Sequence, residues 1–199
     1  MGDGTAKDSE SQSRSAQIIQ DESMRMIRLV DDLLELFRIE PGQIQKSQES
    51  VDVAGLVQHC HEFFAMRAKE GCIILKTELE QVPSIIGDID CLEQVFSNLL
   101  DNALRHTPRG GQVTISVRQA SADFVEITVA DTGPGITQDE LPHVFECFYQ
   151  ADALVGKTGT GLGLAIAREI VRTHGGDIEA RNASSGGAKF IARLPTNPS

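Results

Sequence analysis

Residues 159–164 read Gly-Thr-Gly-Leu-Gly-Leu, and two further motifs precede this segment in the chain. The first, at residues 98–103, is Asn-Leu-Leu-Asp-Asn-Ala, and the second, at residues 131–136, is Asp-Thr-Gly-Pro-Gly-Ile. A glycine-rich hexapeptide alone is weak evidence for a site. In this order, however, a helix that carries two amides, an Asp-x-Gly-x-Gly turn and a glycine-rich helix start predict one pocket built from three separate segments.

The segment Gly159–Leu164 is expected to open a helix. Free backbone N–H groups and the positive end of the helix dipole favour a phosphate at a helix start, and glycines let the backbone approach it closely. The segment is no P-loop, because Lys-Ser/Thr does not follow its last glycine. It is no Rossmann fingerprint either, because Gly-x-Gly-x-x-Gly is absent and no strand directly precedes it.

Asn98 and Asn102 are four residues apart, so both amides lie on one face of the predicted helix. The opposite face suits a core, with Leu92, Val95, Leu99 and Ala103. An Asn carbonyl oxygen is a hard neutral ligand that suits Mg²⁺ bridging nucleotide phosphates. Arg105 points the same way and is placed to meet a phosphate, and His106 follows it. The alternative is that the two amides are only solvated.

The turn at residues 131–136 follows directly on an alternating strand pattern. A carboxylate at a strand end can accept a hydrogen bond from the adenine amino group, and this contact selects adenine over guanine, which carries a carbonyl at that position. The alternative is an ordinary Asp-rich turn. Residues 137–158 contain Phe145-x-x-Phe148 and favour a mobile lid, although both phenylalanines also suit core packing.

Composition and charge limit the class of protein. The chain has 199 residues, 40% of them apolar and 24% charged, as in a soluble globular protein with one sizeable core. A net charge of −11 argues against nucleic acid or an anionic membrane as the main partner. No apolar run reaches the ~18–20 residues that span a bilayer. The four cysteines form no Cys-x-x-Cys motif, and we expect reduced, mostly buried thiols rather than two disulfides.

Four segments are expected along the chain. Residues 1–14 are polar and favour a disordered leader or an expression remnant, residues 15–42 hold one long helix that Pro41-Gly42 ends, residues 43–50 form a polar connector, and residues 51–196 form the main domain. The apolar residues of the helix have the spacing of a bundle or coiled-coil seam, widened on one side. They are Ile19, Met26, Val30, Leu33 and Phe37, with Ile27, Leu34 and Leu36 beside them.

The main domain alternates helix and strand signals. Helices are predicted over 53–69, 89–105 and 162–174, and strands at 73–75, 85–86, 113–117, 125–129, 177–180 and 189–193. Asp88 is the expected N-cap of the second of these helices. The pattern predicts an α/β (α+β) sandwich in which helices cover one face of one mixed sheet.

These motifs resemble those of the sensor histidine kinases of two-component signalling. The resemblance runs from Ala16 to Pro195 and includes the N box at Asn98–Asn102, the G1 box at Asp131–Ile136, the F box at Phe145–Phe148 and the G2 box at Gly159–Leu164. It implies the Bergerat ATP-binding fold with ATP and Mg²⁺ bound, Asn102 on the metal and Asp131 on adenine. The nucleotide contacts that it implies are Asn98, Asn102, Arg105, His106, Asp131, Gly133, Gly135, Ile136, Lys157, Thr158, Gly159, Thr160, Gly161, Leu162, Gly163 and Leu164.

The resemblance also identifies residues 15–42 with the second helix of the family's dimerisation and histidine-phosphotransfer hairpin, and residues 51–196 with the catalytic ATP-binding domain. The family's phosphoacceptor is a His followed by an acidic residue and a Pro, on the first helix of that hairpin. None of the five histidines of this chain has that context, and His61-Glu62, which comes nearest, lacks the Pro. We therefore expect a fragment that binds ATP and does not phosphorylate itself.

The implied function is transfer of the ATP γ-phosphoryl group to a histidine, and from there to an aspartate of a response regulator, in the cytoplasm. The stripe at 15–40 is expected either to form a homodimer or to pack back on the domain, with no nucleic-acid or membrane contact by this fragment.

Three alternatives stay open: an ATPase of the gyrase, Hsp90 or MutL kind, an anti-sigma-factor-like serine kinase, and a non-catalytic nucleotide-binding dimerisation module. Those ATPases place a Glu four residues before the metal Asn, where this chain has Asn98, a poor base. The bundle-type helix argues against the serine kinase, and the intact motifs argue against the non-catalytic module.

Overall fold

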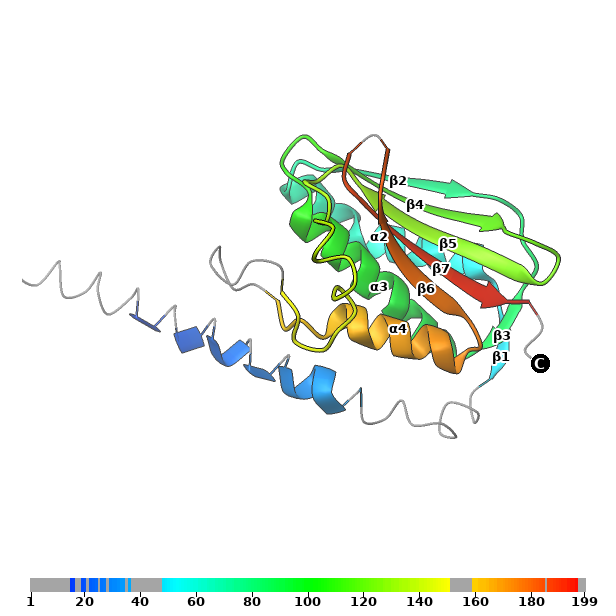
Figure 1. The fold of residues 1–199 in the computed structure, drawn as a ribbon, viewed down its shortest axis with the longest axis horizontal. Helices are drawn as coiled ribbons and strands as arrows, with labels where there is room; N and C mark the ends of the chain where they lie inside the picture. The colour runs from blue at the N-terminus through cyan, green and yellow to red at the C-terminus, as the bar shows by residue number, and fades with distance from the viewer. Residues whose placement is uncertain are drawn as a thin grey trace, which may run out of the picture.

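The computed structural model describes residues 15–16, 19–20, 22–24, 26–27, 29–34, 36, 48–150, 159–184 and 186–196. From residue 48 onward its elements are, in chain order, β1 (Glu49–Val51), α2 (Val53–Glu70), β2 (Ile74–Leu79), β3 (Ile85–Gly87), α3 (Ile89–His106), β4 (Gln112–Gln119), β5 (Phe124–Asp131), α4 (Gly163–Thr173), β6 (Asp177–Asn182) and β7 (Ala188–Pro195). The described residues between 15 and 36 are helical and are called the N-terminal helix below. Figure 1 shows this helix on the side of α4, away from the sheet.

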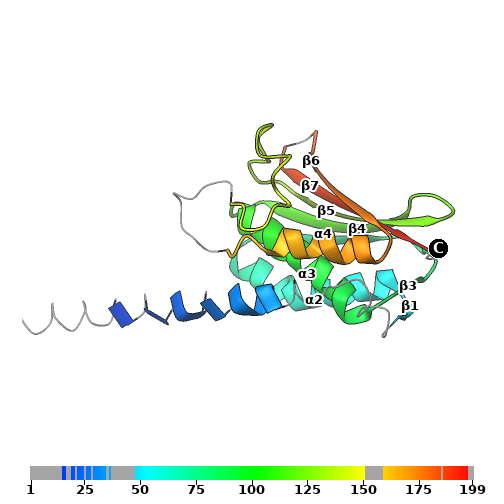
Figure 2. The ribbon, with the colours of Figure 1, turned by 60° about the horizontal axis from the view of Figure 1, so that its bottom comes forward.

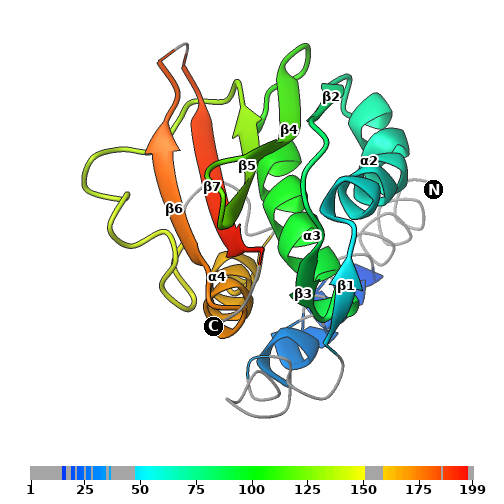
Figure 3. The same ribbon diagram turned by 90° about the vertical axis from the view of Figure 1, so that its right-hand side faces the viewer.

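Five strands form one mixed sheet in the order β2-β4-β5-β7-β6. β2 runs parallel to β4, and the other neighbouring pairs are antiparallel. β2 is longer than the strand predicted at 73–75, because it pairs with β4 along its whole length. Helices α2, α3 and α4 form a layer on one face of the sheet (Figure 2), and Figure 3 shows the same two layers from another side. The predicted sandwich is therefore confirmed.

The start of the domain differs from the prediction. β3, at the strand predicted for 85–86, does not join the main sheet, because it pairs antiparallel with β1 in a separate two-stranded sheet. β1 begins at Glu49, inside the segment 43–50 that the sequence assigns to a connector. In this pairing Val51 lies opposite Ile85, and both side chains are buried. The long-range pairing therefore makes a strand out of a stretch that is polar in sequence.

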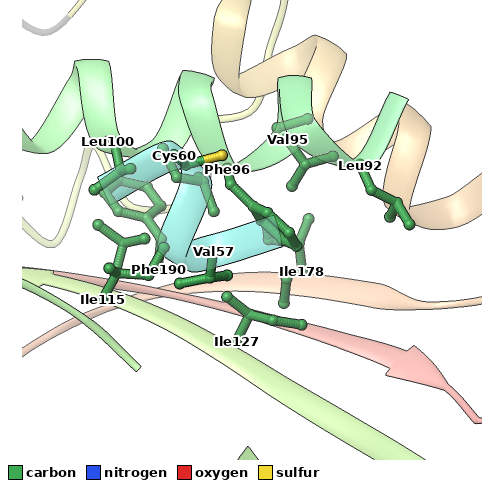
Figure 4. Packing of buried hydrophobic residues seen from close by; sticks show 14 of the residues in the cluster. Val57, Cys60, Leu92, Val95, Phe96, Leu100, Ile115, Ile127, Ile178 and Phe190 are labelled. Atoms are coloured by element: carbon green, nitrogen blue, oxygen red, sulfur yellow. The ribbon is translucent and has the colours of Figure 1, made fainter. Parts of the chain in front are cut away.

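The core lies between α3 and the sheet, as the helix pattern predicts. The inward residues of α3 are fully buried, at 0% exposure, and include Leu92, Val95, Leu99 and Ala103. Figure 4 shows Phe96 of this helix pointing toward the strands that carry Ile127 and Ile178. Full burial of each Leu, Val or Phe side chain of this face contributes about 1.5–3 kcal/mol. Because the apolar stripe faces the sheet, the two amides of α3 face away from it.

The start of α3 is held by a cap and by a buried histidine. The Asp88 side chain accepts a hydrogen bond from the backbone N–H of Cys91, at 3.1 Å, so the predicted N-cap is confirmed. The Asp88 N–H donates to Nε2 of His174, also at 3.1 Å, while Nδ1 of His174 lies 2.8 Å from the Ile170 carbonyl oxygen. Nε2 must accept and Nδ1 must donate in this arrangement, so the ring is neutral. His174 thereby ties the end of α4 to the start of α3.

The apolar stripe of the N-terminal helix is divided between two environments. Leu29, Leu33 and Leu36 are partly buried against the domain core. The residues of the other side are exposed, namely Ile19, Met26, Ile27, Val30 and Leu34. Phe37, predicted to belong to the seam, lies outside the described residues. In the described part of the chain, no helix is long and apolar enough to cross a membrane.

None of the four cysteines is in a disulfide in the structure, and they are not mostly buried, as the sequence analysis expected them to be. Cys60 is buried and Cys91 half-buried, whereas Cys72 and Cys147 are exposed. Burial raises the pKa of the Cys60 thiol to about 11, with a smaller contribution from the charge of Glu93. Cys72 and Cys147 lie in turns that the sequence pattern does not orient, which is why their exposure could not be predicted.

Candidate nucleotide-binding site

The outward face of α3 lies against the glycine-rich segment at two points. A Cβ on Gly163 would lie 3.3 Å from the Asn98 side-chain oxygen, so the first turn of α4 packs on this amide. Two turns further along α3, Gly159 lies against the guanidinium of Arg105, where a Cβ would overlap Nη1. Absence of a side chain at both glycines lets the two segments touch. The structure thus brings together the first and the third motif, as predicted.

Asn98 and Asn102 are half-buried on this face. Nδ2 of Asn98 is buried and has no hydrogen-bond partner in the part of the chain that the structure describes. An unpaired buried amide costs roughly 1–3 kcal/mol, so such an atom indicates a place for a polar ligand or water. The described residues include no group of three or more His, Cys, Asp or Glu side chains that could hold a metal. A Mg²⁺ ion held by one Asn oxygen, waters and nucleotide phosphates fits this donor set.

Asp101 connects two arginines. Its two carboxylate oxygens bind Nη1 of Arg67, on α2, and Nη2 of Arg105. Asp101 and Arg105 are one helical turn apart, and their side chains are 31% and 30% exposed. The ion pair therefore holds the Arg105 guanidinium beside Gly159. This places a positive group at the site of a chain whose net charge of −11 would otherwise repel a phosphate.

His106 and the second motif meet where α3 ends. The backbone oxygen of His106 lies against Gly133, where a Cβ would clash with it. Partial burial, and then the charge of Arg105, lower the pKa of His106 below its ordinary value, although Asp131 and Asp101 act in the opposite direction. The imidazole is therefore neutral at pH 7 and can both donate and accept hydrogen bonds.

Asp131 ends β5 and is only 5% exposed. Its Oδ1 accepts hydrogen bonds from the backbone N–H groups of Gly133, at 2.8 Å, and Ala188, at 3.2 Å. Among the described residues, none donates a hydrogen bond to Oδ2. The carboxylate is therefore fixed through one oxygen, and the other is left to accept a hydrogen bond from a ligand.

Sequence reasoning missed Asn182 and Ala188, which hold the same turn. The Asn182 side chain accepts a hydrogen bond from the Ile136 N–H at 2.8 Å and donates one to the Ile136 carbonyl oxygen at 2.6 Å. Asn182 and Ile136 are 46 residues apart, and Ala188 is 57 residues from Asp131. No local pattern could have found contacts over such separations.

The start of α4 has backbone N–H groups without a side-chain cap. Leu162 is its buried N-cap residue, the half-buried Leu164 packs against the core, and the first turn carries no acidic residue. The Thr160 hydroxyl accepts a hydrogen bond from the Leu162 N–H at 3.3 Å and donates one to Oδ2 of Asp32 at 2.6 Å. The remaining N–H groups suit an anion. Asp32 brings the N-terminal helix to the edge of this site, which the sequence did not indicate.

The two phenylalanines of the predicted lid have different environments. Phe145 is buried and packs edge-on against Phe190, with ring centroids 6.2 Å apart. Phe148 is 57% exposed and has a positive φ of 64°. Its N–H donates to the Gly161 carbonyl oxygen at 2.9 Å, and a Cβ on Gly161 would lie 2.8 Å from the Phe148 carbonyl carbon. Core packing is therefore correct for Phe145 and wrong for Phe148.

Residues 151–158, between the F box and the glycine-rich segment, lie outside the described residues. Their flanks are joined, because the Gln150 side chain donates a hydrogen bond to the Gly159 carbonyl oxygen at 2.8 Å. Lys157 and Thr158 belong to the segment that is not described, so their predicted contacts with the nucleotide stay predictions.

Comparison with known proteins agrees with this geometry. The sequence matches the family of histidine kinase-, DNA gyrase B-, and HSP90-like ATPases over residues 87–198, a span that contains all four motifs. The chain belongs to this family. The signal transduction histidine-protein kinase AfsQ2 of Streptomyces coelicolor is 38% identical over 186 residues, which make up 93% of this chain and 33% of that kinase.

Two solved structures have the same architecture. The structure of full-length ShkA in complex with AMPPNP matches 95% of this chain and 40% of that chain, with a TM-score of 0.80 and 29% identity. The mycobacterial sensor histidine kinase MprB matches 76% of this chain and 100% of that chain, with a TM-score of 0.68 and 30% identity. The resemblance to sensor histidine kinases is thus confirmed. The chain spans less than half the length of AfsQ2 and of the ShkA chain.

Proposed function

We propose that the chain is the ATP-binding catalytic part of a sensor histidine kinase. The observation that carries the proposal is the carboxylate of Asp131, which is fixed through Oδ1 by two backbone N–H groups and keeps Oδ2 open. Such an oxygen accepts a hydrogen bond from the adenine amino group and repels the carbonyl that guanine has at this position. The family membership, and the ShkA complex with AMPPNP, support the same assignment.

The phosphates would lie between α3 and the start of α4. Asn102 would hold Mg²⁺, which neutralises charge on the phosphates when it is bound. Arg105, held beside Gly159 by Asp101, supplies a second positive group. The backbone N–H groups at the start of α4 complete the cradle, and Lys157 and Thr158 are proposed as further contacts.

The reaction is transfer of the γ-phosphoryl group to a histidine of another segment. The bond between the γ-phosphorus and the bridging oxygen breaks, a bond to the imidazole nitrogen forms, and ADP leaves. We propose that an aspartate of a response regulator then takes the group, as the resemblance implies. None of the five histidines has the acceptor context, and His61, the nearest imitation, lies in the middle of α2. We therefore expect no transfer to this chain itself.

Hydrolysis of ATP by water is expected to be slow. Asn98 stands where the related ATPases place a glutamate, and a neutral amide cannot take a proton from water. The one acidic residue within the N box, Asp101, has both carboxylate oxygens engaged by Arg67 and Arg105, so neither oxygen is free to take a proton from water. The site thus favours transfer to a histidine whose own segment supplies the base, over attack by water.

The exposed side of the N-terminal helix is proposed as a homodimer contact. Its apolar residues would lie against a second helix, as in a bundle, while Leu29, Leu33 and Leu36 stay on the domain. A cytoplasmic location is proposed as well, as the resemblance to sensor histidine kinases implies.

The test is nucleotide binding followed by phosphoryl transfer. Calorimetric titration with ATP and Mg²⁺ should show saturable binding, weakened without Mg²⁺. With γ-labelled ATP, the chain alone should stay unlabelled. A separate chain whose helix carries an acceptor His followed by an acidic residue and a Pro should become labelled with an acid-labile phosphate. No measurable binding of ATP would contradict the proposal. Label on this chain alone would contradict the expectation that the acceptor lies elsewhere.

A further inference from the structure

The Asn182 side chain binds the backbone of the turn at residues 131–136 through two hydrogen bonds. Its side-chain amide pairs with both backbone groups of Ile136, at 2.8 Å for the Ile136 N–H and 2.6 Å for the Ile136 carbonyl oxygen. Two such bonds fix both the position and the orientation of a peptide unit. The end of the turn at residues 131–136 is therefore tied to the end of β6.

The turn is shaped to receive this side chain. Gly135 has a φ of 80°, a conformation that residues with a Cβ adopt at a cost. A Cβ on Gly135 would lie 2.9 Å from Oδ1 of Asn182, closer than side chains normally approach. The glycine thus serves two purposes: it allows the left-handed backbone, and it leaves room for the Asn182 amide.

The connection from β6 to β7 also holds the other end of the turn. The Ala188 N–H donates to Oδ1 of Asp131, and Gly187, with a φ of 89°, lies so close that a Cβ would overlap the Asp131 backbone oxygen. The Ala183 N–H donates to the Gly187 carbonyl oxygen at 2.9 Å, which closes the connection itself. The segment from the end of β6 to the start of β7 therefore binds both ends of the turn, Asp131 through Ala188 and Ile136 through Asn182.

We infer that Asn182 is a positioning residue that determines selectivity for adenine. It holds the turn in the conformation in which the Gly133 N–H donates a hydrogen bond to Oδ1 of Asp131. Oδ2 of Asp131 thereby stays directed at the ligand. The inference rests on the proposed function, because it assumes that Asp131 binds the adenine amino group.

The role of Asn182 is separable from the stability of the domain. The Asn182 side chain is exposed, so its removal leaves no cavity in the core. Within the turn, Pro134 has no N–H to donate, and the Gly133 N–H bonds to Asp131. In the described part of the chain, the only hydrogen bonds from the far end of the turn to the sheet are therefore those to Asn182.

The test compares ATP with inosine triphosphate, which has a carbonyl in place of the adenine amino group. In Asn182→Ala, ATP affinity should fall about tenfold, as expected for two side-chain hydrogen bonds. Affinity for inosine triphosphate should not fall, because Asp131 then turns away from the carbonyl, so the selectivity ratio drops. Arg181→Ala is the matched control: Arg181 is the neighbouring residue of β6, is exposed, and pairs with Glu179 instead of the turn.

Two further readouts separate positioning from folding. Hydrogen exchange at the Ile136 amide should be slow in the wild type and fast in Asn182→Ala, with unchanged exchange in the core of α3. Asn182→Asp keeps an acceptor for the Ile136 N–H but sets an oxygen against the Ile136 carbonyl, so it should be no more selective than the alanine variant.

One result would overturn the inference although the wild type binds ATP, namely an unchanged ratio of the two affinities in Asn182→Ala. The ratio stays unchanged if neither affinity falls, and also if both fall equally, as a structural role alone would cause. If the wild type binds neither nucleotide, the proposed function is wrong, and the inference falls with it.

Discussion

The substitution Asp131→Asn tests the adenine contact with the smallest change of shape. Oδ1 of Asp131 accepts hydrogen bonds from Gly133 and Ala188, at 2.8 and 3.2 Å. An asparagine can keep its carbonyl oxygen on these two N–H groups, and its amino group then stands where Oδ2 was. A donor thus replaces the acceptor that faces the ligand, while the fold keeps both of its backbone hydrogen bonds.

The magnitude follows from the bonds that are lost and kept. A hydrogen bond to a charged group contributes about 1.5–3 kcal/mol, so ATP affinity should fall about 10- to 150-fold. Inosine triphosphate should bind more tightly than in the wild type, because its carbonyl now meets a donor. The free energy of unfolding should change by less than about 1 kcal/mol, since neither backbone N–H loses its acceptor.

The assay is calorimetric titration of both nucleotides, with urea unfolding of the same variants. Asp131→Ala is the control: it leaves the buried Ala188 N–H and the half-buried Gly133 N–H unpaired, so it should lose stability, by about 1–3 kcal/mol for the buried N–H and less for the other. Wild-type affinity for ATP in Asp131→Asn would refute the role of Oδ2. An equal fall in affinity for both nucleotides would do so too, because it would show that the substitution damages the pocket without changing which base it prefers.

Three further predictions concern the framework of the domain. Burial alone would raise the pKa of Glu126, but hydrogen bonds from Arg118 and Arg193 outweigh it and hold the pKa below its ordinary value of 4.5. The ionised carboxylate therefore stabilises the fold above that pH, and this stabilisation is lost as the pH falls. Urea unfolding should therefore show Glu126→Gln less stable than the wild type by about 1 kcal/mol at pH 7, and the difference should vanish in acid. Thiol reagents at pH 8 should label the exposed Cys72 at once and Cys60 only after unfolding, because burial raises the Cys60 pKa to about 11. Gly187→Ala should destabilise the domain more than Gly186→Ala, since both have positive φ but only the Cβ on Gly187 meets backbone atoms; equal losses would contradict this.

The sequence determined the features that depend on neighbours within a helical turn or along a strand. The spacing of Leu92, Val95 and Leu99 specifies which face of α3 is buried, and so places Asn98 and Asn102 on the opposite face. The order of the motifs predicted one pocket, and its nucleotide contacts stay predictions. The sandwich followed from the alternation of helix and strand signals. Local periodicity has a physical cause that needs no knowledge of the rest of the chain, which is why the buried face of α3 and the sandwich were predicted correctly.

The tertiary structure decided the contacts that join distant segments. Only the folded chain shows that Asn182 holds a turn 46 residues earlier, and that Asp32 reaches the Thr160 hydroxyl at the edge of the site. It also decided that residues 49–51 pair with β3 and that only one side of the N-terminal helix packs on the domain. These contacts depend on how strands and helices meet in space, and hydrogen bonds between residues far apart in the chain leave no pattern in local sequence.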